Sequence, residues 1–288
     1  MGNESIYTDG NMLEKIFPVP KPIIATLHLL SLPGSHHYRG ESMGELLDYT
    51  IDEVKDLIDA GVDGLIIENH GDIPFLQPDE IGYETVSAMT YIGTEVQKYA
   101  AAYQIPVGVN CLANAAIPAL AIGKAITARF VRVNQFVNAY IANEGFIEGL
   151  AGKIMRYRTM IKAEDIAIFA DVHVKHGSHS IVADRSIREQ AKDVLFFCGD
   201  VLICTGSRTG DPPEEHELRE IKVTPDTPVI IGSGLTVETA ERLLAIADGA
   251  IVASDFKEDG VWQHKVSRER VLRFMDSIRQ IRQKISVR

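Results

Sequence analysis

The strongest constraint on the fold is an alternation, repeated eight times, of short apolar runs and longer amphipathic segments. The runs predict strands at residues 23–28, 62–68, 105–110, 129–134, 166–173, 200–204, 228–232 and 249–254. The segments between and after them predict helices at residues 43–60, 84–103, 115–126, 145–163, 184–197, 213–222, 236–247 and 267–286. Strands that are almost continuously apolar are typical of a parallel sheet covered by helices. Eight such units within roughly 250 residues predict a (β/α)₈ TIM barrel.

The boundaries of these segments support the same interpretation. Gly61 and Gly249 stand where a helix ends before a strand, and Pro106 and Pro228 stand at strand starts, where no ladder donor is lost. A doubly wound open sheet is the alternative fold, but it usually has a G-x-G-x-x-G turn after its first strand. The first strand here is followed by "LLSLPGSHHYRG" instead. We therefore expect one barrel domain over residues 21–288, preceded by an N-terminal extension over residues 1–20.

Composition argues against nucleic-acid binding and against association with membranes. The 288 residues carry 40 acidic and 29 basic side chains, a net charge of −11, which disfavours binding to nucleic acid or to anionic lipid. No run approaches the roughly 20 apolar residues that cross a bilayer, so we expect no integral membrane segment. The N-terminus has no apolar core of a signal peptide. The three cysteines have no metal-type spacing and indicate reduced thiols in the cytoplasm, namely Cys111, Cys198 and Cys204.

Polar side chains gather where the predicted strands end. In a barrel the active site lies at the C-terminal ends of the strands, and alternate side chains along a strand point inward. Inward parity selects Thr26, His28, Glu68, Asn110, Arg132, Asn134, Asp171, His173 and Lys175. Plain structural roles remain open for some of them. His28 could cap a strand, and Glu68 could form an ion pair with Arg132 across neighbouring strands.

The stretch "IAIFADVHVKH" is the richest of these strand ends. Asp171 and His173 are two residues apart, a spacing that suits a metal pair, an acid–base pair or a carboxylate that orients an imidazole. Lys175 could form a Schiff base or bind an anionic group of a substrate. The candidate catalytic residues are thus His28, Glu68, Asp171, His173 and Lys175, and all but Lys175 are candidate ligands of a divalent metal ion. The loop histidines are expected to be exposed, although the cavity mouth could recruit them, namely His36, His37, His176 and His179.

A second signal is "PVIIGSGLTVETAERL", in which a strand ends in a glycine-rich turn before a helix. Backbone N–H groups at such a turn bind anions, and many barrels hold phosphate after strands seven and eight. The alternative is that the glycines only permit a tight turn. The candidate substrate- and phosphate-binding residues are Asn110, Arg132, Asn134, Gly232, Ser233, Gly234 and Ser254. The long loop "CTGSRTGDPPEEHEL" could act as a lid, with Arg208 over a substrate anion.

Seven stretches taken together resemble the BtpA/SgcQ family of TIM-barrel proteins. They are "LHLLSLPGS", "GVDGLIIENHGDIPF", "PVGVNCLANAAIPALAIG", "RFVRVNQFVNAY", "EGFIEGLAGKIMRYR", "IAIFADVHVKH" and "VIIGSGLT". The resemblance implies a barrel of the phosphate-binding type and associates the chain with sugar metabolism or with photosystem I biogenesis. It assigns no catalytic residue. The chain departs from the family pattern at Ala115, where an Asp often follows the Asn.

Two functions are compatible with these observations. The first is an enzyme that acts on a small phosphorylated metabolite, a sugar phosphate or a nucleotide-like compound, by acid–base chemistry with or without a divalent metal. Isomerase or epimerase, lyase and hydrolase all fit the residues. The second is a non-enzymatic assembly factor of the photosystem I biogenesis type that uses the barrel as a scaffold. The ring of polar strand ends favours the enzyme, and we expect a homo-oligomer in either case.

Overall fold

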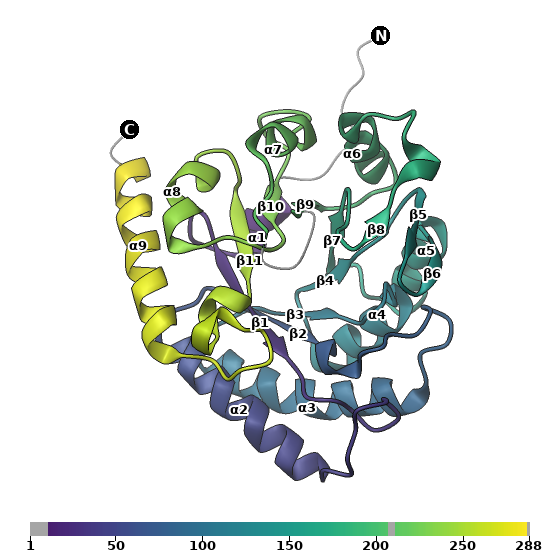
Figure 1. Ribbon diagram of the computed structural model, residues 1–288, viewed down its shortest axis with the longest axis vertical. Coiled ribbons are helices and arrows are strands. Elements are labelled where there is room, and N and C mark those ends of the chain that lie inside the picture. Colours follow the sequence, from purple (N-terminus) through teal and green to yellow (C-terminus); the bar gives the residue numbers. More distant parts are fainter. Residues whose placement is uncertain (1–10, 207–210, 287–288) are drawn as a thin grey trace.

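In the computed structural model, which describes residues 11–206 and 211–286, eight parallel strands close into a barrel (Figure 1). Around the barrel the strand order is β1-β11-β10-β9-β7-β4-β3-β2, so that β1 pairs with both β11 and β2. The strands are β1 (Ile23–His28), β2 (Gly64–Glu68), β3 (Val107–Asn110), β4 (Phe130–Val133), β7 (Ala167–Asp171), β9 (Val201–Cys204), β10 (Val229–Ile231) and β11 (Gly249–Val252). The closed order confirms the predicted TIM barrel and excludes the open sheet.

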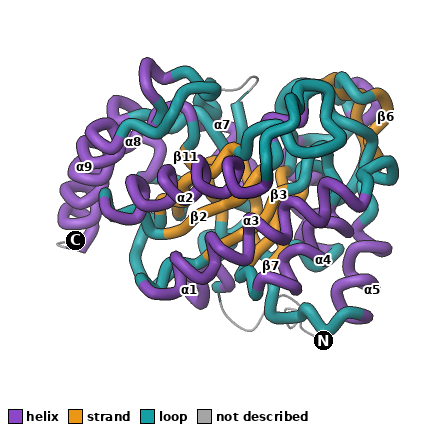
Figure 2. The backbone as a smooth tube through the Cα atoms, turned by 90° about the horizontal axis from the view of Figure 1, so that it is seen from below, coloured by secondary structure: helices purple, strands orange, loops and turns teal. Residues whose placement is uncertain are grey.

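Helices surround the strands on the outside, as the view from below shows (Figure 2). They are α2 (Met43–Asp59), α3 (Tyr83–Ala102), α4 (Ala116–Ile126), α5 (Ala151–Met160), α6 (Ile187–Phe196), α7 (Glu215–Ile221), α8 (Val237–Leu244) and α9 (Arg268–Ser286). Local signals fix some of their starts. Ser42 and Glu45 form a capping box at α2, as Ser186 and Glu189 do at α6. Among the helices of the described residues, none is both long and apolar enough to cross a membrane.

The lower half of the barrel interior is apolar. Phe130 and Phe169 stack there with ring centroids 4.5 Å apart. Gly108 makes room for them, because a Cβ at this position would lie 2.2 Å from the Phe130 ring. Helix α1 (Met12–Ile16), within the N-terminal segment, adds Leu13, Ile16 and Phe17 to the same buried cluster. Inside the barrel, the buried polar side chains that the structure describes therefore lie toward the other end.

Two element boundaries differ from the sequence prediction in ways that affect the site. Residues 145–148, predicted as the start of a helix, form β6 (Gly145–Glu148), which pairs antiparallel with β5 (Ala139–Ala142). The positive φ of Gly145 (+102°) accommodates the hairpin turn between them. β8 (Gly177–Ser178) completes this small sheet. In addition, β7 ends at Asp171 instead of His173, so the two residues do not share a strand face.

Candidate active site

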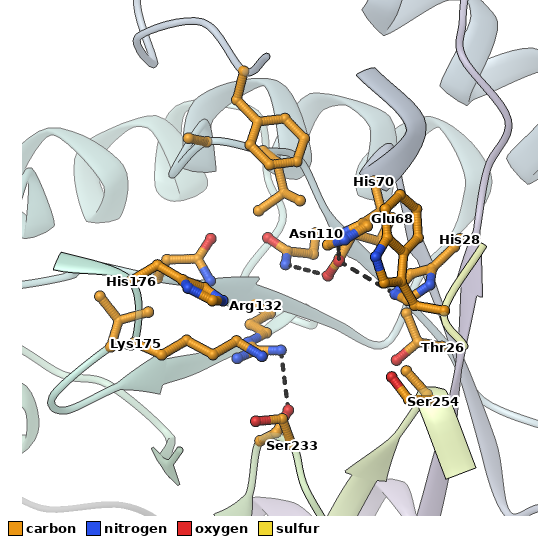
Figure 3. A pocket seen from close by; sticks show the side chains of 18 of the residues that line it. Thr26, His28, Glu68, His70, Asn110, Arg132, Lys175, His176, Ser233 and Ser254 are labelled. Atoms are coloured by element: carbon orange, nitrogen blue, oxygen red, sulfur yellow. Dashed lines mark hydrogen bonds and ion pairs between the residues drawn. The ribbon is translucent and has the colours of Figure 1, made fainter. Parts of the chain in front are cut away.

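A cavity of about 560 Å³ opens at the C-terminal ends of the strands. Most of the predicted site residues line it. Figure 3 labels many of them, and their side chains point inward from different strands and loops. These lining residues are Thr26, His28, Glu68, Asn110, Arg132, Asn134, Lys175, Gly232, Ser233, Gly234 and Ser254. Segments that are far apart in the sequence thus contribute to one cavity.

Glu68 is the centre of one wall of the cavity. Its Oε1 lies 3.0 Å from Nδ1 of His70 and 3.7 Å from Nε2 of His28, while its Oε2 accepts a 2.6 Å hydrogen bond from Asn110. Burial opposes ionisation of Glu68, but the hydrogen bond with His70 and the positive charge of Arg132 among its neighbours hold its pKa well below the usual range. Burial, followed by the neighbouring His70, lowers the pKa of His28 to about 3. The wall therefore presents an ionised carboxylate and a neutral imidazole at pH 7.

His70 was not among the candidates predicted from the sequence. It opens a 3₁₀ turn, η1 (His70–Asp72), directly after β2. The adjacent Asn69 is buried and ties this turn to the next loop, accepting a 2.7 Å hydrogen bond from the backbone N–H of Leu112 and donating to the carboxylate of Asp72. Asp72 in turn accepts from the backbone N–H of Leu32 in the loop after β1. The one signal in the sequence was parity, since His70 continues the inward register of Glu68 by two residues.

Arg132 pairs with Asp171, which corrects the predicted Glu68–Arg132 ion pair. Nε and Nη2 of Arg132 donate to the two carboxylate oxygens of Asp171 at 2.9 and 3.0 Å. Asp171 is 2% exposed and is not one of the described residues that line the cavity. The structure therefore places Asp171 behind the cavity lining, where it holds the guanidinium of Arg132, which does line the cavity.

His173 is also displaced from its predicted place. Because β7 ends at Asp171, the chain turns, and the His173 ring packs on His179 with centroids 3.8 Å apart. His173 is outside the described lining of the cavity and outside the metal-type cluster. Lys175 returns to the cavity from this loop, beside Arg132 and His176 (Figure 3). Burial and the charge of Arg132 lower the pKa of Lys175 to about 8.

A neighbouring wall, beyond β1 around the barrel, is the glycine-rich turn after β10 together with the end of β11. Gly234 has a φ of +76°, and the Oγ of Ser233 is buried without a partner among the described residues. Ser254 opens η3 (Ser254–Phe256) beside Thr26 (Figure 3). The neighbouring Asp255 reaches the cavity lining, but its carboxylate accepts a 3.2 Å hydrogen bond from Arg270. Arg208, predicted to cover the site, lies outside the described residues.

Two further structures close the sides of the cavity. The hairpin β5–β6 contributes Tyr140 and Ala142, a wall that the sequence prediction had assigned partly to a helix. On the other side, Trp262 lies edge-on to His70, with ring centroids 4.4 Å apart. The Trp262 segment is anchored by the buried Lys257, whose Nζ donates to both carboxylate oxygens of Glu53 on α2 at 2.7 and 2.9 Å.

The closed parallel barrel, with its polar cavity at the C-terminal strand ends, defines the chain as a TIM-barrel protein. Solved structures with the same fold include a thiamine phosphate pyrophosphorylase from Pyrococcus furiosus, with a TM-score of 0.56 and 14% identity over 91% of this chain and 96% of that one. Orotidine 5′-monophosphate decarboxylase from Methanocaldococcus jannaschii, solved with the inhibitor BMP, gives a TM-score of 0.53 and 14% identity over 90% and 98%. At these identities the likeness establishes the fold.

Sequence similarity places the chain within this class. The BtpA family profile matches residues 19–280, and the chain belongs to the BtpA family. An uncharacterized protein of Archaeoglobus fulgidus is 39% identical over 255 residues, covering 88% of this chain and 97% of its own length. The photosystem I biogenesis protein BtpA of Synechocystis is 34% identical over 268 residues, covering 92% and 91%. The family resemblance seen in the sequence is thereby confirmed.

Proposed function

We propose that this protein is an enzyme that acts on a small phosphorylated metabolite, a sugar phosphate or a nucleotide-like compound, by acid–base chemistry. The observation that carries the proposal is the contrast between the two walls of one cavity. One wall groups a carboxylate with two imidazoles, and the neighbouring wall consists of a glycine-rich turn and hydroxyl groups. Two cationic side chains, Arg132 and Lys175, reach the same cavity from another side (Figure 3).

The glycine-rich wall is suited to hold the phosphate. The turn at Gly232–Gly234 precedes helix α8, and backbone N–H groups in such turns bind anions. Ser233 and Ser254 add hydroxyl groups that can donate to phosphate oxygens. Arg132 supplies fixed positive charge, because Asp171 occupies Nε and Nη2 while Nη1 points toward the carbonyl of Gly232 at 3.4 Å. Phosphate bound here would fix the rest of the substrate against Glu68.

The wall that carries Glu68, His28 and His70 is suited to move protons. Glu68 is ionised and shares a hydrogen bond with His70, whose imidazole can take up or return a proton, and the neutral imidazole of His28 lies beside them. Lys175, cationic below its pKa of about 8, can stabilise an enolate or another oxyanion that forms between the walls. An isomerase, epimerase, lyase or hydrolase uses these same groups. Some of the solved barrels have phosphorylated compounds in their names, and this substrate class is what we propose for this chain.

The proposal is tested by comparing ligands that differ only in the phosphate. Isothermal titration of the protein with ribose 5-phosphate, ribose and inorganic phosphate should give binding that requires the phosphate group. Lys175→Met should weaken it roughly tenfold or more, because a charge-assisted contact is lost. Lys153→Met, at an exposed position on α5, is the matched control and should bind as the wild type does. Equal affinity for ribose and ribose 5-phosphate, or no binding of either, would contradict the assignment.

A role in assembly is the second candidate, and the relative from Synechocystis favours it. Beside the cavity mouth, the small sheet and the turn next to it expose Ile141, Phe146 and Ile181, each between 46% and 57% accessible. An assembly factor should lose its partner when Phe146 becomes Ser and should tolerate Glu68→Gln, whereas an enzyme should show the reverse in a turnover assay. We also propose a cytoplasmic homo-oligomer, and light scattering after size exclusion would measure its subunit number.

A further inference from the structure

We propose that His28, Glu68 and His70 bind one divalent first-row transition-metal ion at the ends of β1 and β2. The inference deepens the proposed function, since it concerns the same cavity, but it does not require a phosphorylated ligand to be tested. It also replaces the ligand set expected from the sequence, because His70 joins His28 and Glu68 in place of Asp171 and His173.

The three side chains converge on a common point. One potential ligand atom from each residue lies within 4.8 Å of the other two. Among the described residues, no other group of three or more His, Cys, Asp or Glu side chains brings its potential ligand atoms this close together. Metal–nitrogen and metal–oxygen bonds of roughly 2.0–2.2 Å fit inside such a triangle after small side-chain movements. Two imidazoles with one carboxylate suit zinc, iron or cobalt, whereas magnesium and calcium prefer oxygen ligands.

The surroundings of Glu68 leave one oxygen for the ion. Asn110 donates to Oε2, which fixes the plane of the carboxylate and directs Oε1 toward both histidines. Groups that orient a metal ligand in this way are a regular part of metal sites. All three proposed ligands line the cavity, so the ion would keep positions open toward a substrate or water. Open positions are the mark of a catalytic rather than a structural site.

A metal-free proton relay is the competing explanation. His70, at 3.0 Å from Oε1 of Glu68, would be enough for such a relay, but it leaves His28 unexplained: this second imidazole stacks on His70 at 4.4 Å and its Nε2 lies 3.7 Å from the same Oε1. The other histidine pairs provide a contrast. His36 with His37 and His173 with His179 also lie in ring contact, but neither pair belongs to a group with a carboxylate. When bound, the ion could polarise a carbonyl group or lower the pKa of a bound water.

Trp262 offers a direct probe of the proposed site, since it is the single tryptophan of the chain and its ring lies 4.4 Å from that of His70. Metal-stripped protein is titrated with Co²⁺ while Trp262 fluorescence and visible absorption are followed. Zn²⁺ binding is measured in parallel by calorimetry. We expect saturable quenching, ligand-field bands and a stoichiometry of one ion per chain, all without any phosphorylated compound.

Variants identify the ligands. Glu68→Gln and His70→Ala should each weaken Zn²⁺ binding by more than roughly 100-fold, beyond the effect of removing an outer-shell partner. His173→Gln and the double change His36→Gln/His37→Gln should bind Zn²⁺ as the wild type does. Thermal unfolding checks that each variant is folded, and Glu68→Gln preserves the side-chain shape if His70→Ala does not fold. Absence of saturable binding, wild-type affinity in Glu68→Gln, or loss of affinity in His173→Gln would overturn the site. Since phosphate binding is measured separately, failure of either proposal can be recognised on its own.

Discussion

Arg132 and Asp171 form a two-point ion pair between the adjacent strands β4 and β7, with side chains that are 7% and 0% exposed. Asp171 is more buried than Glu68, the other carboxylate at a strand end, and it lies beneath the cavity and not in its lining. The consequence of the pair is that the Arg132 guanidinium is fixed in direction, with Nη1 turned toward the glycine-rich wall. Asp171 is thus a positioning residue in our proposal, and Arg132 is the group that meets the substrate.

Asp171→Asn should therefore impair stability as well as binding. It leaves the buried guanidinium without its counter-charge, which typically destabilises a protein by about 3–5 kcal/mol. We expect a lower midpoint of urea denaturation and a weaker response to ribose 5-phosphate. Asp165→Asn, whose side chain is 73% exposed, is the control and should leave both unchanged. An Asp171→Asn variant with wild-type stability would contradict the structural role of the pair.

For the buried ion pair Glu53–Lys257, we predict that replacing one partner destabilises the protein more than replacing both. Lys257→Met should destabilise the protein by about 3–5 kcal/mol, because Glu53 then remains buried without its counter-charge and keeps the Tyr49 hydroxyl and the N–H of Val266 as hydrogen-bond donors. The double variant Glu53→Leu/Lys257→Met should recover much of this loss, since apolar replacement of both partners removes the unpaired charge. Circular dichroism reports global unfolding, and Trp262 fluorescence reports the anchored segment. Equal loss in the single and double variants would show that the charge is not the cause.

These two pairs show how far sequence reasoning reaches. Apolar runs and turn glycines specify the barrel, and period-two parity was enough to place His28, Glu68, Asn110 and Arg132 at one mouth. The partner of the buried Arg132 was predicted wrongly. Glu68 and Asp171 were both candidates, but β3 lies between β2 and β4, whereas β7, which carries Asp171, pairs directly with β4.

Site residues that lie beyond the ends of regular strands were the second kind that the sequence could not place. His173 was assigned by continuing a strand two residues past its real end, and His70 was passed over because it follows the end of one. Its position depends on side-chain contacts of Asn69 and Asp72 with two other loops. Contacts between loops distant in sequence leave no periodic signal, so the loop-borne part of the site is visible only in three dimensions.

The lowered pKa of Lys175 predicts that ligand binding depends on pH. Burial and the charge of Arg132 lower its pKa to about 8, while Glu68, Asp171 and Asp211 are the nearby acidic groups that raise it. The side chain is cationic below this pH and neutral above it, so affinity for a phosphate monoester should fall by up to about tenfold between pH 7 and pH 9. The phosphate stays a dianion over most of this range, because its second pKa is about 6.

The check is calorimetric titration with ribose 5-phosphate at several pH values. Lys175→Met should bind more weakly at pH 7 and show a flatter profile, whereas Lys153→Met should follow the wild type. A profile in Lys175→Met as steep as that of the wild type would assign the titration to another group.

Asn69 offers a test of how His70 is held. Asn69→Ala removes the acceptor of the Leu112 N–H and the donor to Asp72, both in a region from which water is largely excluded. Leaving such groups unsatisfied should lower the free energy of unfolding by about 1–3 kcal/mol. The turn that carries His70 should also loosen, so Zn²⁺ affinity should fall by about 10–100-fold although no ligand is changed. Asn138→Gly serves as the control, because it removes a part-buried amide with a 3.4 Å bond to Asp193 while glycine tolerates the positive φ of Asn138. If Asn69→Ala lost stability but kept full affinity for Zn²⁺, the position of His70 would not depend on the contacts between loops.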